Sequence, residues 1–276
     1  MLIFGGTAAV KNFSFDESSK DGPIVQATAK SFAKRVIHRV KDTTGYRLLR
    51  TKRIGVDWLD DVARIAREGW NPNFTKLETF FDVGANIGQT ARKLTDRTQA
   101  KQIFSFEPVP TTFQRLHDNT VHLPNVKCFE YGLSDINGSA TINLYGASVL
   151  ASTCDVSPIM SPSSDAFERT ETIQLRTLDS VCDEHDINRI DVLKTDTEGA
   201  DLRTIYGAET MLSQKRIGFV LFEFYCPEAE NTSNGTLFPV NACLAKHGYR
   251  LVSFYTDYVH NTQSIGVYNA LYMATP

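Results

Sequence analysis

The chain has 276 residues, of which 42% are hydrophobic and 22% are charged, a composition typical of an ordinary soluble globular protein. Its length allows one sizeable α/β domain with an extension, or two small domains. The formal net charge of −3 excludes the strongly basic composition typical of proteins that bind nucleic acids. We therefore expect no nucleic-acid partner.

The five cysteines are far apart in the sequence and include no C-x-x-C pair, so neither a zinc motif nor a redox motif is predicted. Free thiols favour a reducing compartment. No hydrophobic run approaches the roughly 20 residues needed to span a bilayer, and the first residues lack the basic leader of a signal peptide. We expect a cytoplasmic protein without a transmembrane segment, and the sequence does not indicate an oligomeric state.

Residues 1–76 show no alternation of strands and helices. Hydrophobic residues at helical spacing predict a basic amphipathic helix over residues 27–41 and a second helix over residues 58–68. The basic face of the first helix could contact an anionic membrane or substrate, or could simply be solvated. We predict a helical extension over residues 1–76, followed by the main domain over residues 77–276.

From residue 77 onward, strands and helices alternate, which predicts an α/β fold with a mostly parallel sheet covered on both faces. A strand, a tight turn and the start of a helix are expected over residues 79–89. Further strands are predicted at 102–106, 126–131, 190–196 and 218–224, with extended segments at 139–145 and 171–176. Helices are predicted at 89–98, 110–120, 178–185, 200–213 and 239–247. The last two strands, at 249–255 and 268–274, are expected to form an antiparallel hairpin at the sheet edge.

Two segments interrupt this alternation. Residues 146–170 are rich in serine, proline and alanine, and residues 226–236 are polar. Long loops without secondary structure are usually functional or disordered. The first segment is therefore a candidate lid over a binding site.

The glycine-containing turn after the first strand has the pattern D-x-G-x-N-x-G, from Asp82 to Gly88. It lacks the lysine of a P-loop and has Asn86 where the dinucleotide-binding pattern has its middle glycine. Asparagine tolerates the left-handed conformation, so the turn can survive this change. Because Asp82 would repel a pyrophosphate but attract a cationic amino-acid group, the turn favours S-adenosylmethionine over NAD.

Acidic residues occur at or just after the ends of several predicted strands. Glu107 ends the second strand, where a carboxylate can accept both hydroxyl groups of a ribose. Others are Asp82, Asp135, Asp196, Glu198 and Glu223. Ligands of open parallel sheets bind at the carboxyl ends of the strands. We therefore expect these residues to surround one site.

Five motifs then appear in order: FDVGANIGQ (81–89), FSFEP (104–108), GLSD (132–135), LD (178–179) and LKTDTEGAD (193–201). Together they resemble the successive motifs of FkbM-type methyltransferases, over about residues 77–225. The resemblance implies a Rossmann-like class I fold that uses S-adenosylmethionine to methylate a hydroxyl group, often on a sugar or a natural product.

The resemblance also implies roles for individual residues. The methionine portion of the cofactor would be surrounded by Asp82, Gly84, Asn86 and Gly88, with Ala85 and Asp196 also in contact with the cofactor. Glu107 would hold the ribose. Ser134 and Asp135 would lie near the adenine.

The sequence offers several candidates for the residue that removes the proton from the acceptor. Asp196 and Glu198 are the first candidates for the general base, followed by Glu223 and His247. Glu198 could instead cap the following helix. Asp196, Glu198 and Glu223 could together bind a divalent cation, although the sequence favours a site without metal. The alternatives to a methyltransferase are an NAD-type oxidoreductase and a non-catalytic binding module on the same fold.

Overall fold

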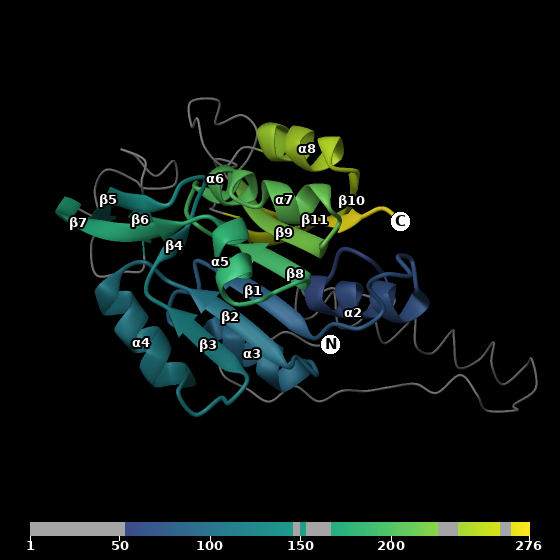
Figure 1. Ribbon diagram of the computed structural model, residues 1–276, viewed down its shortest axis with the longest axis horizontal. Helices are drawn as coiled ribbons and strands as arrows, with labels where there is room; N and C mark the ends of the chain where they lie inside the picture. Colours follow the sequence, from purple (N-terminus) through teal and green to yellow (C-terminus); the bar gives the residue numbers. More distant parts are fainter. Residues whose placement is uncertain (1–52, 146–149, 153–166, 226–236, 260–265) are drawn as a thin grey trace, which may run out of the picture. The chain divides into compact units, whose positions relative to one another are not determined.

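A seven-stranded sheet in the order β10-β11-β9-β8-β1-β2-β3 organises the computed structural model (Figure 1). The structure describes residues 53–145, 150–152, 167–225, 237–259 and 266–276. The strands of this sheet are β1 (Thr79–Val83), β2 (Gln102–Phe106), β3 (Val126–Phe129), β8 (Ile190–Thr195), β9 (Ile217–Tyr225), β10 (Tyr249–Val259) and β11 (Gly266–Ala274).

The pairing of strands confirms the predicted fold class. Strands β3, β2, β1, β8 and β9 are parallel to one another, whereas β11 is antiparallel to both β9 and β10. The expected C-terminal hairpin is therefore present, with β11 inserted between β9 and β10. The central strands are buried almost throughout, which explains why they appear in the sequence as continuous hydrophobic runs.

Helices cover both faces of this sheet. Helices α3 (Gln89–Arg97) and α4 (Pro110–Thr120) connect β1, β2 and β3, while α5 (Leu178–Glu184), α6 (Asp201–Tyr206) and α7 (Glu209–Ser213) flank β8. Because the strand order reverses direction at β1, right-handed crossovers place these two groups on opposite faces. Helix α8 (Leu237–Lys246) lies beside α6 and α7 (Figure 1).

Residues 139–145 and 171–176 do not extend the main sheet. They lie in β5 (Gly138–Tyr145) and β7 (Phe167–Arg176), which belong to a second sheet in the order β4-β7-β5-β6, together with β4 (Gly132–Leu133) and β6 (Leu150–Ser152). Four of their buried residues pack in one cluster with Val109, which precedes α4; these are Ile142, Leu144, Ile173 and Leu175.

The predicted helix over 200–213 is two helices, because the chain turns at Gly207. A Cβ atom at Gly207 would lie 1.9 Å from the carbonyl oxygen of Ser134, so only glycine allows the backbones to approach this closely. The predicted strand 126–131 likewise ends two residues early, at Phe129.

Helix α2 (Trp58–Glu68) has the predicted bounds. Asp57 caps it by accepting hydrogen bonds from the amides of Leu59 and Asp60, and Gly69 ends it in the left-handed conformation. The helix belongs to the compact unit Asp57–Pro276. The predicted helix over 27–41, much of 146–170, and all of 226–236 lie outside the described residues, so the extension and the lid stay predictions.

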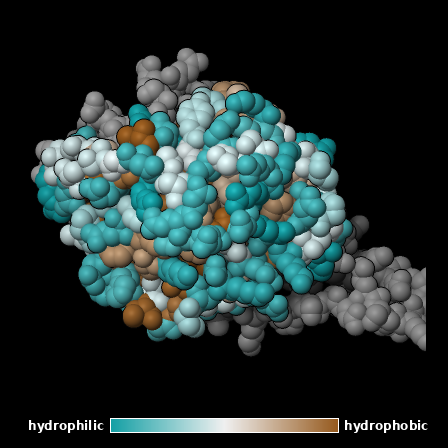
Figure 2. Space-filling model, in the orientation of Figure 1, coloured by the Kyte–Doolittle hydropathy of each residue, from teal (hydrophilic) through white to brown (hydrophobic). Residues whose placement is uncertain are grey.

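On the face shown in Figure 2, the hydrophobic residues among those described form small, separate spots on a mostly hydrophilic surface. None of the helices in the described ranges combines the length and hydrophobicity required to span a membrane.

Candidate cofactor and active site

A cavity of about 920 Å³ lies at the carboxyl ends of β1, β2, β8 and β9. Most of the predicted site residues line it, namely Gly84, Ala85, Asn86, Glu107, Ser134, Asp196, Glu198 and Glu223. Four predicted residues are absent from its lining: Asp82, Gly88, Asp135 and His247. Of the six acidic residues that the sequence singled out, four line the cavity, whereas Asp82 and Asp135 do not.

The glycines of the turn are required by packing. Gly84 has a φ of 76°, and a Cβ atom there would lie 1.9 Å from the carbonyl oxygen of Asp196. Gly88 has a φ of 88°, and its Cβ atom would lie 2.9 Å from Cγ2 of Thr120 on α4. Asn86 adopts a φ of 51°, as expected for an asparagine in place of glycine. The turn thus fits tightly against β8 and α4 while its other side faces the cavity.

Glu107 holds this turn against the end of β2. Its Oε2 accepts a hydrogen bond from the amide of Asn86 at 3.1 Å, and its Oε1 accepts one from the amide of Val109 at 3.0 Å. Burial raises the pKa of Glu107 to about 7, against the opposing effect of these two hydrogen bonds. Because a carboxylate oxygen can accept more than one hydrogen bond, the side chain can still receive the hydroxyl groups of a ligand.

A network of three charged residues lies at the wall of the cavity. Lys194 is paired with Asp82 in the β1–β8 register, and its Nζ lies 3.8 Å from Oδ1 of Asp82 and 2.9 Å from Oδ2 of Asp196. Burial would lower the pKa of Lys194, but the two carboxylates raise it on balance. Burial also raises the pKa of Asp82 to about 6. The cationic partner of Asp82 is thus supplied by the chain itself.

Glu223, the acidic residue of β9, is not part of the ion pairs that Lys194 forms with Asp82 and Asp196. Glu223 is 8% exposed, and burial together with the nearby charges of Asp196 and Glu198 raises its pKa to about 10. This shift favours the protonated carboxylic acid, which can donate a hydrogen bond. Asp196 has a side chain that is 34% exposed and reaches the cavity.

At the other end of the cavity, the amide of Ser134 donates to the carbonyl of Arg176 at 2.8 Å, and its hydroxyl donates to Oδ1 of Asp135 at 3.0 Å. Asp135 in turn lies 3.6 Å from Arg203 of α6. Asp135 thus positions two residues that line the cavity, Ser134 and Arg203, and is not itself part of the lining.

Sequence reasoning missed several lining residues. The second sheet contributes hydrophobic side chains to the cavity, including Ile142, Ile173 and Leu175. Their alternation with polar residues predicted strands but not where those strands would pack. Lys194 was also overlooked, although a lysine inside a buried hydrophobic strand is itself an unusual signal.

His247 is remote from this constellation. It follows α8, and its Nε2 lies 3.0 Å from Oε2 of Glu209 on α7. Because it does not line the cavity, we do not retain it as a candidate base.

The model of the FkbM methyltransferase domain matches residues 82–251. One relative is the 2-O-methyltransferase NoeI of Sinorhizobium fredii, 28% identical over 151 residues, which are 52% of this chain and 61% of that protein. Another is the hexuronic acid methyltransferase AglP of Haloferax volcanii, 26% identical over 151 residues, 54% of this chain and 56% of that protein. The matches thus span less than two thirds of either relative.

Among solved structures, an rRNA methylase from Streptococcus thermophilus is 9% identical, with a TM-score of 0.44 over 79% of this chain and 96% of that one. This likeness is too slight to support a conclusion. The family match, in contrast, covers more than half of the chain and includes the strand ends that form the cavity. The chain belongs to the FkbM methyltransferase family.

Proposed function

We propose that the chain is an S-adenosylmethionine-dependent methyltransferase that methylates a hydroxyl group of a saccharide or a small natural product. The observation that carries the proposal is one cavity, which joins the turn held by Glu107 to the acidic ends of β8 and β9. The names of the two relatives, which describe 2-O-methyl transfer and methylation of a hexuronic acid, support the choice of a saccharide hydroxyl.

The residues of the cavity fit this cofactor. Oδ1 of Asn86 is buried without a hydrogen-bond partner among the described residues, so it can accept a hydrogen bond from an ammonium or hydroxyl group. Glu107 would hold the ribose, and the hydrophobic side chains of Ile142 and Leu175 would contact the adenine near Ser134. When bound, S-adenosylmethionine supplies an electrophilic methyl group next to a good leaving group.

The chain's own residues would then align the acceptor, exclude water and take up a proton. Orientation of the acceptor oxygen can supply roughly 7–11 kcal/mol of the barrier reduction, and a general base adds a factor of about 10²–10⁴. We assign the base to Asp196, because it reaches the cavity and its Oδ2 is held by Lys194. Glu223, as a neutral acid, would donate a hydrogen bond and keep its proton.

Family membership favours methyl transfer over the NAD-dependent alternative, and binding tests can separate the two. In calorimetry, the full chain should bind S-adenosylmethionine with micromolar affinity, and Glu107→Ala should abolish binding. The exposed Glu130 provides a matched control, because Glu130→Ala should bind like the unaltered chain. Binding of NAD and not of S-adenosylmethionine would refute the proposal.

A second experiment separates an enzyme from a binding module. Transfer of a labelled methyl group from S-adenosylmethionine to a saccharide acceptor would identify an enzyme. Cofactor binding without transfer to any of a panel of hexoses, hexuronic acids and their oligomers would favour a binding module.

We also place the protein in the cytoplasm, because the three described cysteines, Cys128, Cys182 and Cys243, are free thiols.

A further inference from the structure

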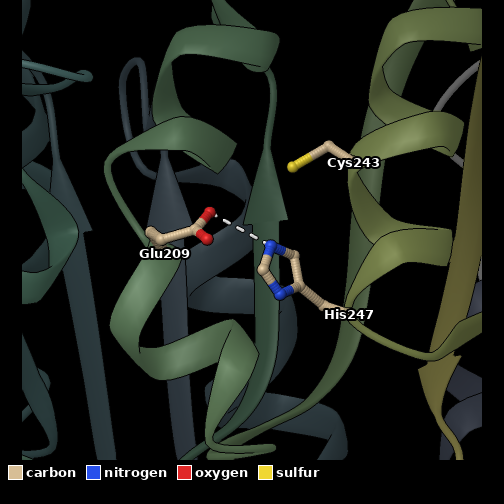
Figure 3. Close-up of side chains that lie close together, drawn as sticks. All are labelled: Glu209, Cys243 and His247. Atoms are coloured by element: carbon tan, nitrogen blue, oxygen red, sulfur yellow. Dashed lines mark hydrogen bonds and ion pairs between the residues drawn. The ribbon is translucent and has the colours of Figure 1, made fainter.

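Three side chains of the kinds that bind metal ions converge outside the cavity, where α7 meets the end of α8. Glu209 is the first residue of α7, Cys243 lies on α8, and His247 follows that helix (Figure 3). One ligand atom from each residue lies within 4.8 Å of the other two. None of the three lines the cavity, so the cluster is separate from the candidate methyl-transfer site.

The spacing of these atoms is close to that of a tetrahedral metal site. Nε2 of His247 lies 3.0 Å from Oε2 of Glu209. Bonds from zinc of about 2.3 Å to sulfur and about 2.0 Å to nitrogen or oxygen place neighbouring ligand atoms roughly 3–4 Å apart. Figure 3 shows the carboxylate and the thiol on the same side of the imidazole ring. Small side-chain rotations would therefore bring all three atoms to one ion.

The ligand types select the metal. A thiolate, an imidazole and a carboxylate form a mixed sulfur, nitrogen and oxygen set, which suits Zn²⁺, whereas Mg²⁺ and Ca²⁺ prefer oxygen ligands alone. Cys243 and His247 are 9% and 8% exposed, and the side chain of Glu209 is 53% exposed. Solvent can thus reach the ion from the Glu209 side and provide a fourth ligand.

The surrounding contacts hold the ligands in place. Asp179 accepts hydrogen bonds from the amides of Thr210 and Met211 at 2.8 and 3.1 Å, which anchors the start of α7. Lys246 lies 3.3 Å from Oε1 of Glu209, so it occupies one carboxylate oxygen and leaves Oε2 directed at the imidazole.

We propose that Glu209, Cys243 and His247 bind one Zn²⁺ ion, with water as the fourth ligand, and that this ion joins α7 to α8. On binding, the Cys243 thiol releases its proton to solvent and its sulfur bonds to the metal, so no oxidant or reductant is needed. Because the thiol must lose its proton to bind the metal, binding should strengthen as the pH rises. Because the site lies away from the cavity, we assign the ion no part in methyl transfer.

Titration of the metal-free full chain with Co²⁺ tests the site, because a cobalt–thiolate bond gives an intense near-ultraviolet charge-transfer band. The unaltered chain should develop this band with one equivalent of Co²⁺, and Zn²⁺ should abolish it by displacement. Cys243→Ser should remove the band. Cys182→Ser, which alters another buried free thiol, should retain it.

His247→Gln and Glu209→Gln should each weaken Zn²⁺ binding about 10- to 100-fold or more. Glu209 is exposed, so its variant remains informative even if the Cys243 or His247 variants fold poorly. A band that persists in Cys243→Ser, or a chain that takes up no Co²⁺, would overturn the proposal. Methyl transfer, measured separately, should survive chelation of the metal; its loss would contradict the structural role.

Discussion

Both the backbone conformation of Gly84 and its contact with Asp196 exclude a side chain at this position. Its φ of 76° lies in the left-handed region, and a Cβ atom added there would lie only 1.9 Å from the carbonyl oxygen of Asp196, which leaves no room for a side chain. The same residue packs the turn after β1 against the end of β8, so a change there would disturb two adjoining segments of the cavity wall.

We expect Gly84→Ala to destabilise the fold by about 2–4 kcal/mol, since left-handed backbone strain adds to a steric clash. Urea unfolding would measure this loss. Gly138→Ala is the matched control, because a Cβ atom there meets nothing within 4 Å, and it should change the unfolding free energy only slightly. Equal effects of the two substitutions would show that the close contact does not limit the fold.

Asp196 and Glu223 can be distinguished by amide substitutions. Because burial raises the pKa of Glu223 and favours its neutral form, Glu223→Gln preserves a neutral hydrogen-bonding group. Asp196→Asn removes the proposed base. We expect Asp196→Asn to lower kcat by about 10²–10⁴ and Glu223→Gln to lower it less than about tenfold. Steady-state kinetics at saturating S-adenosylmethionine would check this, and the reverse ranking would assign the base to Glu223.

At the scale of elements, α2 is attached to the C-terminal hairpin. The Tyr255 hydroxyl on β10 donates to Oδ2 of the buried Asp61 at 2.9 Å, and Nδ2 of Asn71 donates to the carbonyl of Ala274 at 2.7 Å. These contacts join residues that are 194 and 203 positions apart in the sequence. They connect a helix from the start of the described chain to the strands that close the sheet.

Tyr255→Phe should therefore cost about 1.5–3 kcal/mol, the usual contribution of a hydrogen bond to a charged group. Denaturant unfolding of the full chain would measure the loss. Tyr268→Phe, on the neighbouring strand, is the control, since its hydroxyl makes no hydrogen bond to the described residues. If both variants unfold at the same denaturant concentration as the unaltered chain, the contact with Asp61 is not stabilising.

At the scale of the whole molecule, burial of acids at one sheet edge makes stability depend on pH. Burial raises the pKa of Asp82 and Asp201 to about 6, of Glu107 to about 7 and of Glu223 to about 10. Folding favours the protonated form of each group. The contribution of these acids to the free energy of unfolding is therefore fully present below the ordinary pKa of a carboxyl group. It is lost as the pH rises through their pKa values in the folded protein.

The melting temperature of the ligand-free protein should accordingly fall by several degrees between about pH 5 and about pH 8. Exposed acids whose pKa is lowered by salt bridges, such as Glu78 and Glu184, have already lost their protons in this range. Calorimetric scans would detect the fall. Above about pH 7, the decline should be shallower in Glu223→Gln; an unchanged slope would show that Glu223 does not titrate as proposed.

The alternation of strands and helices, the parallel core and the hairpin were all predictable from the sequence, because hydrophobic periodicity and buried runs are local properties of the chain. The bounds of α2 and α4 were predicted without error for the same reason. The motifs at the strand ends also predicted most of the cavity lining, since parallel strands bring their carboxyl ends to one edge.

Only the tertiary structure decided the rest, because it depends on contacts between residues distant in the sequence. The separate second sheet, the break at Gly207 against Ser134 and the pairing of Lys194 with Asp82 all arise from such contacts. The proximity of Glu209 to Cys243 and His247 also results from such contacts. No sequence motif predicts it. Local patterns specify elements and their order, whereas the packing of those elements decides which side chains share a site.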